Sequence, residues 1–200
     1  MIRAFVAVEL NPEVRAAVAR LQEEIKSRVE RALLRAAPQA RIQWVRPEAV
    51  HLTLKFLGDV DEARIPEVEQ ALERAVAPLT RFAVEAGGLG AFPDSRAPRV
   101  LWVALGGQTN HLARLASQVE RALEPLGFPP EMKPFNPHLT LARIKERSRD
   151  VGRVMAESGV VESGGVLGRL DVDAVALIKS ELKPSGAVYT RLFQVPLAAG

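Results

Sequence analysis

The sequence predicts an α+β fold, with two antiparallel or mixed sheets, helices on the outer faces of the sheets and a cleft between them. Two observations support this prediction. The order strand, helix, turn, strand, helix, strand can be read twice along the 200 residues. Within that order, the phrase His-Leu-Thr-Leu occurs at 51–54 and again at 138–141. We therefore expect one bilobal domain over 1–200, with sequence halves of about 1–93 and 99–200 and some exchange of strands between the lobes.

The first half begins with an apolar strand and a long amphipathic helix. Residues 2–9 form the strand, and Asn11-Pro12 provide a helix start with proline in the first turn. Apolar residues at three- and four-residue spacing predict a helix over 12–36. The further elements are a strand over 41–45, the first repeat strand over 50–57 ended by Gly58-Asp59, a helix over 61–76, and a strand over 80–87 broken by Gly87, Gly88 and Gly90.

The order of elements restarts after a polar loop at 94–98. The sequence Lys183-Pro184-Ser185-Gly186 then predicts a hairpin turn near the end of the chain. This hairpin, and the short connection before His51, favour antiparallel pairing over parallel βαβ units. The elements of this half are a strand over 99–105, a helix over 109–124, the second repeat strand over 138–144, a helix over 148–157, and strands over 166–182 and 187–195.

The composition excludes several classes of protein. The chain has no cysteine, which rules out a disulfide framework, a thiolate zinc site and a cysteine nucleophile. Hydrophobic residues make up 48%, enough for a core, and the net charge of +3 is compatible with an anionic substrate. No apolar run reaches about 18 residues and no targeting segment is visible, so we expect a cytoplasmic monomer without membrane association.

The repeated phrase contains two of the three histidines of the chain. On a strand, residues i and i+2 point to the same face. His51 and Thr53 should therefore share one face, and His138 and Thr140 another, with the leucines directed into a core. One imidazole can act as general base while the other acts as general acid. The threonine hydroxyls can donate to the oxygens of a phosphodiester between the histidines, in a scheme that requires no metal.

Other interpretations of the repeated phrase stay open. A single histidine on a strand is more often structural than catalytic. A covalent phosphohistidine intermediate is compatible with the same residues. A zinc site is disfavoured, because two histidines are too few for a usual ligand set and no carboxylate lies at ligand spacing beside either copy. The third histidine, His111, begins a predicted helix, and we interpret it as a solvated residue outside the site.

Three further residues are candidates for substrate binding. Strict alternation places Lys55 on the face of His51, where it can neutralise phosphate charge, although a solvated edge lysine fits equally well. The same arithmetic places Arg143 on the face opposite His138, so it reaches the site only if the strand ends or twists there. Phe5 is a candidate for stacking a base, with core packing as the alternative. The other aromatic candidates are Trp44, Phe56 on the leucine face, Trp102, Phe135 and Tyr189.

The segments HLTLKFLG at 51–58 and HLTLAR at 138–143 resemble the two HxTx motifs of the two-histidine (2H) phosphoesterases. The opening RAFVAVEL also resembles the first strand of the LigT-like bacterial and archaeal members of that superfamily. These are called 2′-5′ RNA ligases or RNA 2′,3′-cyclic phosphodiesterases, and the likeness extends over nearly the whole chain. The resemblance implies a bilobal fold with a pseudo-twofold axis, in which both motifs face a central cleft.

The resemblance also implies an activity that needs neither metal nor cofactor. The family hydrolyses a 2′,3′-cyclic phosphate at an RNA 3′ end and leaves a 2′-phosphate. In these terms His51 is the proton donor to the leaving 3′ oxygen, and His138 is the proton acceptor that activates water. Thr53 and Thr140 hold the phosphate oxygens, and Arg143 matches a family arginine near the substrate. The alternatives are 2′-5′ ligation of tRNA halves, cleavage of 2′,5′-linked oligoadenylate, and RNA binding without catalysis.

Overall fold

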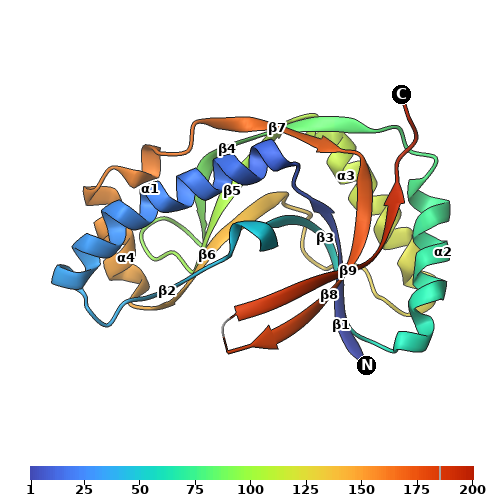
Figure 1. The fold of residues 1–200 in the computed structure, drawn as a ribbon, viewed down its shortest axis with the longest axis horizontal. Helices are drawn as coiled ribbons and strands as arrows, with labels where there is room; N and C mark the ends of the chain where they lie inside the picture. Colours follow the sequence, from blue (N-terminus) through green and yellow to red (C-terminus); the bar gives the residue numbers. More distant parts are fainter. Residues whose placement is uncertain (185) are drawn as a thin grey trace.

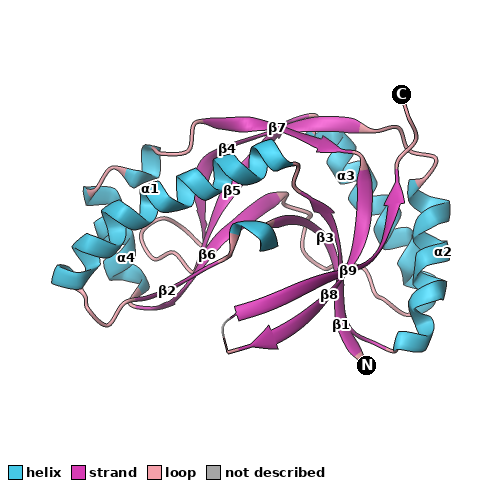
Figure 2. Cartoon of the chain, in the orientation of Figure 1, coloured by secondary structure: helices cyan, strands magenta, loops and turns pink. Residues whose placement is uncertain are grey.

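The computed structural model describes residues 1–184 and 186–200 as an α+β fold (Figures 1 and 2). The helices are α1 (Pro12–Ala36), α2 (Ile65–Val76), α3 (Thr109–Leu123) and α4 (Ser148–Glu157). The strands are β1 (Ile2–Glu9), β2 (Arg41–Trp44), β3 (His51–Val60), β4 (Phe82–Phe92), β5 (Val100–Gly107), β6 (His138–Glu146), β7 (Val166–Val172), β8 (Ala174–Lys183) and β9 (Gly186–Pro196). The helices α1 and α4 lie at one end of the view in Figure 1, and α2 and α3 lie at the other.

The strands form one curled antiparallel sheet. Their order is β7-β4-β5-β6-β3-β1-β8-β9, and β2 pairs with β6 outside this path. We predicted two sheets, but in the described residues the ladders join all nine strands into one. The central junction between β3 and β6 is a single residue pair, Leu52 with Leu139. With so few ladder hydrogen bonds at its centre, the sheet can bend there.

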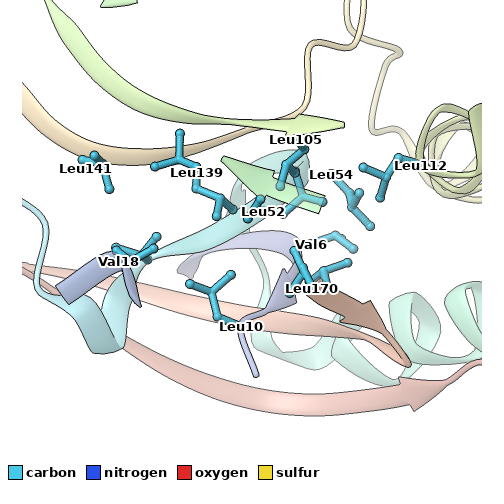
Figure 3. Packing of buried hydrophobic residues seen from close by; sticks show 14 of the residues in the cluster. Val6, Leu10, Val18, Leu52, Leu54, Leu105, Leu112, Leu139, Leu141 and Leu170 are labelled. Atoms are coloured by element: carbon cyan, nitrogen blue, oxygen red, sulfur yellow. The ribbon is translucent and has the colours of Figure 1, made fainter. Parts of the chain in front are cut away.

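The leucines of the repeated phrase lie in the core. Leu52 and Leu139 are fully buried, and the second leucine of each phrase is buried beside them (Figure 3). Val18 of α1 and Leu112 of α3 belong to the same cluster, so helices from both ends cover this face of the sheet. Burying one leucine side chain stabilises the fold by roughly 1.5–3 kcal/mol. This burial fixes which face of each strand turns inward, and it leaves the opposite face to the histidines.

A β-bulge follows the threonine in both copies of the phrase. In β3, Lys55 pairs with Val6 and Thr53 pairs with Ala7, so Leu54 is an extra residue. In β6, the register against β5 skips Leu141 in the same way. An extra residue reverses the faces of all side chains that follow it. The alternation predicted from the sequence therefore holds up to each threonine and fails beyond the bulge.

A buried glutamine supports the second bulge. Gln22 of α1 is only 1% exposed. Its side-chain amide donates to the carbonyl oxygen of Leu141 at 3.0 Å and to that of Val45 at 2.7 Å. The N–H of Val45 also donates to the carbonyl of Leu141 at 2.9 Å. These bonds pair backbone groups that the interrupted ladder would otherwise leave without partners in the core.

Three predicted strands differ from the observed ones. β3 does not end at Gly58-Asp59 but continues to Val60, because Gly58 and Asp59 both pair with β1. β4 continues to Phe92, because Gly87 and Gly88 form a bulge opposite β5, with a φ of 83° at Gly88 that favours glycine. The single strand predicted over 166–182 is divided into β7 and β8 at Asp173. β7 pairs with β4, whereas β8 pairs with β1, so the partner strand changes at Asp173. There the backbone carbonyl of Asp173 accepts a hydrogen bond from the N–H of Leu197 at 2.7 Å. The predicted turn at 183–186 includes residue 185, which lies outside the described residues.

In the described part of the chain, no helix combines the length and the apolar character that a membrane crossing requires.

Candidate active site

Each histidine of the repeated phrase is held by the backbone in the same way. The Nδ1 atom of His51 lies 2.8 Å from the carbonyl oxygen of Ala49, and the Nδ1 atom of His138 lies 2.7 Å from that of Asn136. A carbonyl oxygen can only accept, so each Nδ1 carries a proton and donates it. In a neutral imidazole, Nε2 is then the unprotonated nitrogen. Both rings therefore have Nε2 available to accept or deliver a proton.

The two threonines lie on the same face as the histidines. The Nε2 atom of His51 is 2.9 Å from Oγ1 of Thr53. Leu52 pairs with Leu139, so the two histidine–threonine pairs flank the central junction of the sheet on neighbouring strands. The leucines between them point to the opposite face, into the core.

Aromatic rings surround both imidazoles. Phe5 stacks on His51 with a centroid distance of 4.5 Å, and Tyr189 meets the same ring edge-on at 5.3 Å. Phe92 lies edge-on to His138 at 5.1 Å, and Trp102 is 6.2 Å away. Phe5 is only 3% exposed, so its ring packs against His51 and does not offer an open face to a base, which corrects its predicted role. Its contact with His51 nevertheless keeps it in the site.

The surroundings of His51 have opposing effects on the pKa of its imidazole, and the net effect is to lower it. Burial lowers the pKa of its imidazole, and the positive charges of Arg143 and His138 lower it further. The hydrogen bond to Ala49 and the negative charge of Glu9 raise the pKa, but burial has the largest effect. Burial also raises the pKa of the Tyr189 hydroxyl, against the positive charges of Arg143 and Arg3. Arg143 thus lowers the pKa of both groups, and it lines the same groove as Tyr189.

The predicted face of Arg143 is wrong, because of the bulge at Leu141. After the extra residue, Ala142 turns into the core and Arg143 is exposed. Arg143 lines a groove together with Phe5 and Tyr189, the two residues that contact His51. The bulge therefore places Arg143 on the same face of the sheet as His138, whereas strict alternation placed it on the opposite face.

The predicted face of Lys55 is also wrong, for the matching reason. The bulge at Leu54 turns Lys55 away from His51, and its side chain is 1% exposed. Its ammonium group donates to the Glu120 carboxylate and to the carbonyl oxygen of Pro129, both at 2.7 Å. Lys55 is therefore a buried structural cation that ties β3 to α3, and it lies outside the candidate site.

Sequence reasoning missed several residues near the histidines. Phe56, assigned to the leucine face, is 60% exposed and lies 6.0 Å from Phe5. Glu9 pairs directly with His51 across β1 and β3. Alternation along β1 from Phe5 to Glu9 could have indicated that carboxylate, whereas the approach of Tyr189 depends on how the C-terminal hairpin packs. Within the described residues, no three His, Cys, Asp or Glu side chains cluster closely enough to hold a metal ion.

Two histidines anchored through Nδ1, each followed two residues later by a threonine and carried on neighbouring strands of a curled antiparallel sheet, form the arrangement expected of a two-histidine phosphoesterase. Within that class, the chain belongs to the family described as LigT like Phosphoesterase, whose model matches residues 8–102 and 105–189. The family predicted from the two repeated motifs is therefore confirmed.

Related proteins agree with this assignment. A curated RNA 2′,3′-cyclic phosphodiesterase from Aeropyrum pernix is 40% identical over 160 residues, which cover 79% of this chain and 88% of the relative. One from Aquifex aeolicus is 33% identical and covers 95% of this chain and 94% of the relative. A crystal structure of a Thermus thermophilus protein has a TM-score of 0.74 at 31% identity, covering 98% of this chain and 97% of that one. Apo LigT from E. coli shares the fold, with a TM-score of 0.72, 22% identity and 98% of each chain covered.

Proposed function

We propose that the protein is an RNA 2′,3′-cyclic phosphodiesterase that hydrolyses the terminal cyclic phosphate to a 2′-phosphate. The observation that carries this proposal is the pair of imidazoles with Nδ1 fixed on backbone carbonyls and Nε2 available for proton transfer. Curated relatives with this name cover most of the chain. The same geometry suits no reaction better than one that needs a base and an acid at the two sides of one phosphorus atom.

The proposed reaction is a single displacement. His138 Nε2 removes a proton from water as the water oxygen forms a bond to phosphorus. The bond from phosphorus to the 3′ oxygen breaks, and His51 Nε2 delivers its proton to that oxygen. Water is thereby added across the bond, which gives a 3′-hydroxyl and a 2′-phosphate. The pair needs no metal in this scheme, and each proton transfer contributes about 10²–10⁴-fold to the rate.

The remaining polar groups stabilise the transition state. Thr53 and Thr140 donate their hydroxyl protons to the two non-bridging oxygens, where negative charge grows. The guanidinium of Arg143 balances that charge from the edge of the site. In the free protein, the Thr53 hydroxyl is engaged with His51 Nε2 at 2.9 Å. Substrate binding must therefore break this hydrogen bond before either group can reach the phosphate.

Assignment of the acid to His51 has support from the neighbouring strands. Glu9 lies opposite His51, whereas Ala104 lies opposite His138 at the corresponding register position. A carboxylate favours a protonated imidazole, and a proton donor must start protonated. Burial works against this by lowering the pKa of His51. An arriving phosphate anion adds a second negative charge, which raises the pKa at the moment when the proton is needed.

We further propose that the chain is one bilobal domain, duplicated about a pseudo-twofold axis between β6 and β3, and that it acts as a monomer. Supporting features are the equal numbers of strands on either side of that junction along the main path of the sheet, and the matching bulges. The lobes exchange strands relative to the sequence halves 1–93 and 99–200, because β8 and β9 lie beside β1 while β7 lies beside β4. A monomer suffices because one chain supplies both histidines.

An assay with RNA ending in a 2′,3′-cyclic phosphate tests the proposed function. With EDTA present, we expect conversion to a 2′-phosphate, identified by its resistance to a 3′-specific phosphatase. Absence of turnover, or loss of turnover on adding EDTA, would reject metal-independent hydrolysis. The same residues can run the analogous displacement in which a 5′-hydroxyl replaces water as the nucleophile, so that the bond to the 3′ oxygen breaks and a 2′-5′ phosphodiester forms. High concentrations of tRNA halves in the same assay should show whether 2′-5′ ligation accompanies hydrolysis.

A further inference from the structure

A groove of about 470 Å³ lies beside the aromatic residues that contact His51. Its sides are formed by β1 and β3, by β2 and β6, and by the β8–β9 hairpin. Phe5 and Tyr189, which contact His51, lie in its wall together with Arg143. Arg46 donates from Nη2 to the carbonyl oxygen of Ala187 at 3.3 Å, which links the hairpin to the opposite side. The groove thus adjoins the proposed active site through Phe5 and Tyr189, and it is bounded on several sides.

The charged side chains that line the groove are all positive. Among its described lining residues, four are cationic and none is Asp or Glu. The whole chain has 27 basic and 24 acidic residues, so this segregation is not a consequence of composition. The four cations come from three segments that are distant in sequence: Arg3, Arg46, Arg143 and Lys145. Cations gathered along a groove are suited to a polyanion.

An exposed aromatic ring accompanies these charges. Phe56 lines the groove and is 60% exposed, which is unusual for a phenylalanine. The bulge at Leu54 turns it outward, beside the buried Phe5 at 6.0 Å. A ring with a free face, next to cations, is the combination with which proteins bind unpaired bases of a single strand.

A second groove lacks these properties, and it shares Glu9, Arg15 and Arg191 with the small pocket that His51 itself lines. It measures about 430 Å³ and is lined by acidic and basic residues together, including Glu9, Asp171 and Asp173 with Arg15 and Arg191. Its carboxylates would repel a phosphate backbone. Of the two grooves, the cationic one is therefore suited to nucleic acid.

We propose that the cationic groove binds the single-stranded RNA that precedes the terminal cyclic phosphate, so that the substrate is an oligonucleotide strand. Arg3, Arg46 and Lys145 contact its phosphates, and Phe56 stacks on one of its bases. This inference rests on the proposed function for the identity of the RNA end. The strand is single because stacking on Phe56 requires a base that is not paired within a duplex.

Direct binding tests this proposal without relying on turnover. The probe is a 5′-fluorescein-labelled hexaribonucleotide ending in a 2′-phosphate, and its affinity is measured by anisotropy across a range of salt concentrations. The double variant Arg3→Gln/Lys145→Gln should bind at least about tenfold more weakly. Its slope of log affinity against log salt should be shallower by about 1.4, since each lost phosphate contact changes the slope by about 0.7 for a single strand.

Two further variants separate charge from stacking. Phe56→Ser should weaken binding by about tenfold and leave the salt slope unchanged, since stacking releases no counterions. The matched control is Arg74→Gln/Arg121→Gln, which removes two exposed positive charges from the face formed by α2 and α3. This control should bind the probe like the wild type.

Three results would overturn the proposal. The groove variant and the control variant would bind equally, the hexaribonucleotide would bind no more tightly than a nucleoside 2′-phosphate, or a hexaglutamate peptide would compete as well as the RNA. The last result would indicate a general anion surface. If the binding results are as expected but no variant and no wild-type protein hydrolyses a cyclic phosphate, the groove stands and the proposed function falls.

Discussion

The surroundings of His51 and those of His138 begin alike and then diverge. Both rings are anchored through Nδ1 to the carbonyl two residues earlier, and both are followed by a threonine and a bulge. Beyond the bulge, the equivalent positions carry Lys55 and Phe56 on β3 but Ala142 and Arg143 on β6. In the proposed mechanism the shared residues transfer protons, whereas the residues beyond the bulges differ in place: Lys55 is buried in an ion pair and Arg143 is exposed.

The neighbouring strands add to this divergence. β1 presents Glu9 to His51, whereas β5 presents Ala104 to His138. A carboxylate beside only one of two similar imidazoles can give them opposite protonation states at one pH. In the proposed mechanism, the repeated motif therefore provides two similar proton carriers, and the residues around each motif decide which one donates.

The largest expected effect follows from removing either proton carrier. His51→Ala and His138→Ala should each lower kcat by about 10²–10⁴-fold, because each removes a general acid or base. Initial rates with cyclic phosphate-terminated RNA in EDTA measure this. The matched control is His111→Ala, at the exposed start of α3, which should keep wild-type activity. Retention of activity within tenfold in either site variant would contradict the mechanism.

A modified substrate distinguishes the two histidines. Sulfur in place of the 3′ bridging oxygen leaves without needing a proton. We expect His51→Ala to recover most of its activity on this substrate, whereas His138→Ala remains inactive because water still needs a base. The reverse pattern would exchange the acid and base assignments.

Substitution of Arg143, the cation that follows the second bulge, should give the next largest loss of activity. Arg143→Met should lower kcat/KM by about 100-fold, comparable to the loss of one transition-state hydrogen-bond donor. Steady-state kinetics with the RNA substrate measure this change. Arg153→Met, which removes an exposed arginine from α4, serves as the control and should be nearly silent. Equal effects of the two variants would show that overall charge, and not the position of Arg143, matters.

Substitution of Lys55, the cation that follows the first bulge, should lower the stability of the fold and leave catalysis unchanged. Lys55→Met should lower the free energy of unfolding by about 3 kcal/mol, because it leaves the largely buried Glu120 carboxylate without its partner. Urea denaturation measures the loss, and kcat of the folded variant should be unchanged. Lys26→Met breaks an exposed pair with Glu23 and should cost less than about 1 kcal/mol. A Lys55→Met enzyme with normal stability and low kcat would return this residue to the site.

The smallest effect should come from Glu9→Gln. The negative charge of Glu9 raises the pKa of His51, so its removal should lower that pKa further. If His51 is the acid, activity is lost as pH rises through this pKa. The limb of the profile of kcat/KM that falls with rising pH should then move to lower pH.

If Glu9→Gln instead moves the limb of the kcat/KM profile that rises with pH, His51 is the base. If neither limb moves, Glu9 does not set the pKa of His51. Glu13→Gln, at the exposed start of α1, is the control for a change in overall charge.

Much of the site was predictable because it precedes the bulges. Alternation of polar and apolar residues in HLTL predicted the faces of His51, Thr53, His138 and Thr140. The buried leucines keep those faces fixed. Alternation put Lys55, Phe56 and Arg143 on the wrong faces, because a bulge changes the register without changing the local residue pattern. At the second bulge, the side chain of Gln22, on α1, pairs the backbone around Leu141. No short-range pattern contains that contact.

The fold was predictable at the same level. The α+β class and most elements followed from periodicity, because each strand and helix buries one face. The division at Asp173 and the continuation of β4 past its glycines were not, since both depend on which distant strand pairs with the segment. For the same reason, the joining of all strands through one residue pair could not be read from the chain.

The bulge has a consequence for protein engineering. Transplanting His-x-Thr onto another antiparallel sheet would copy two side chains but would leave the fifth and sixth positions on the wrong faces. The transferable unit is at least six residues long, includes the unpaired leucine, and needs a donor on a neighbouring element to satisfy the interrupted ladder, as Gln22 does here. A design that pairs all six residues in a regular ladder, with no bulge at the leucine, would direct the arginine into its core and the alanine into its catalytic centre.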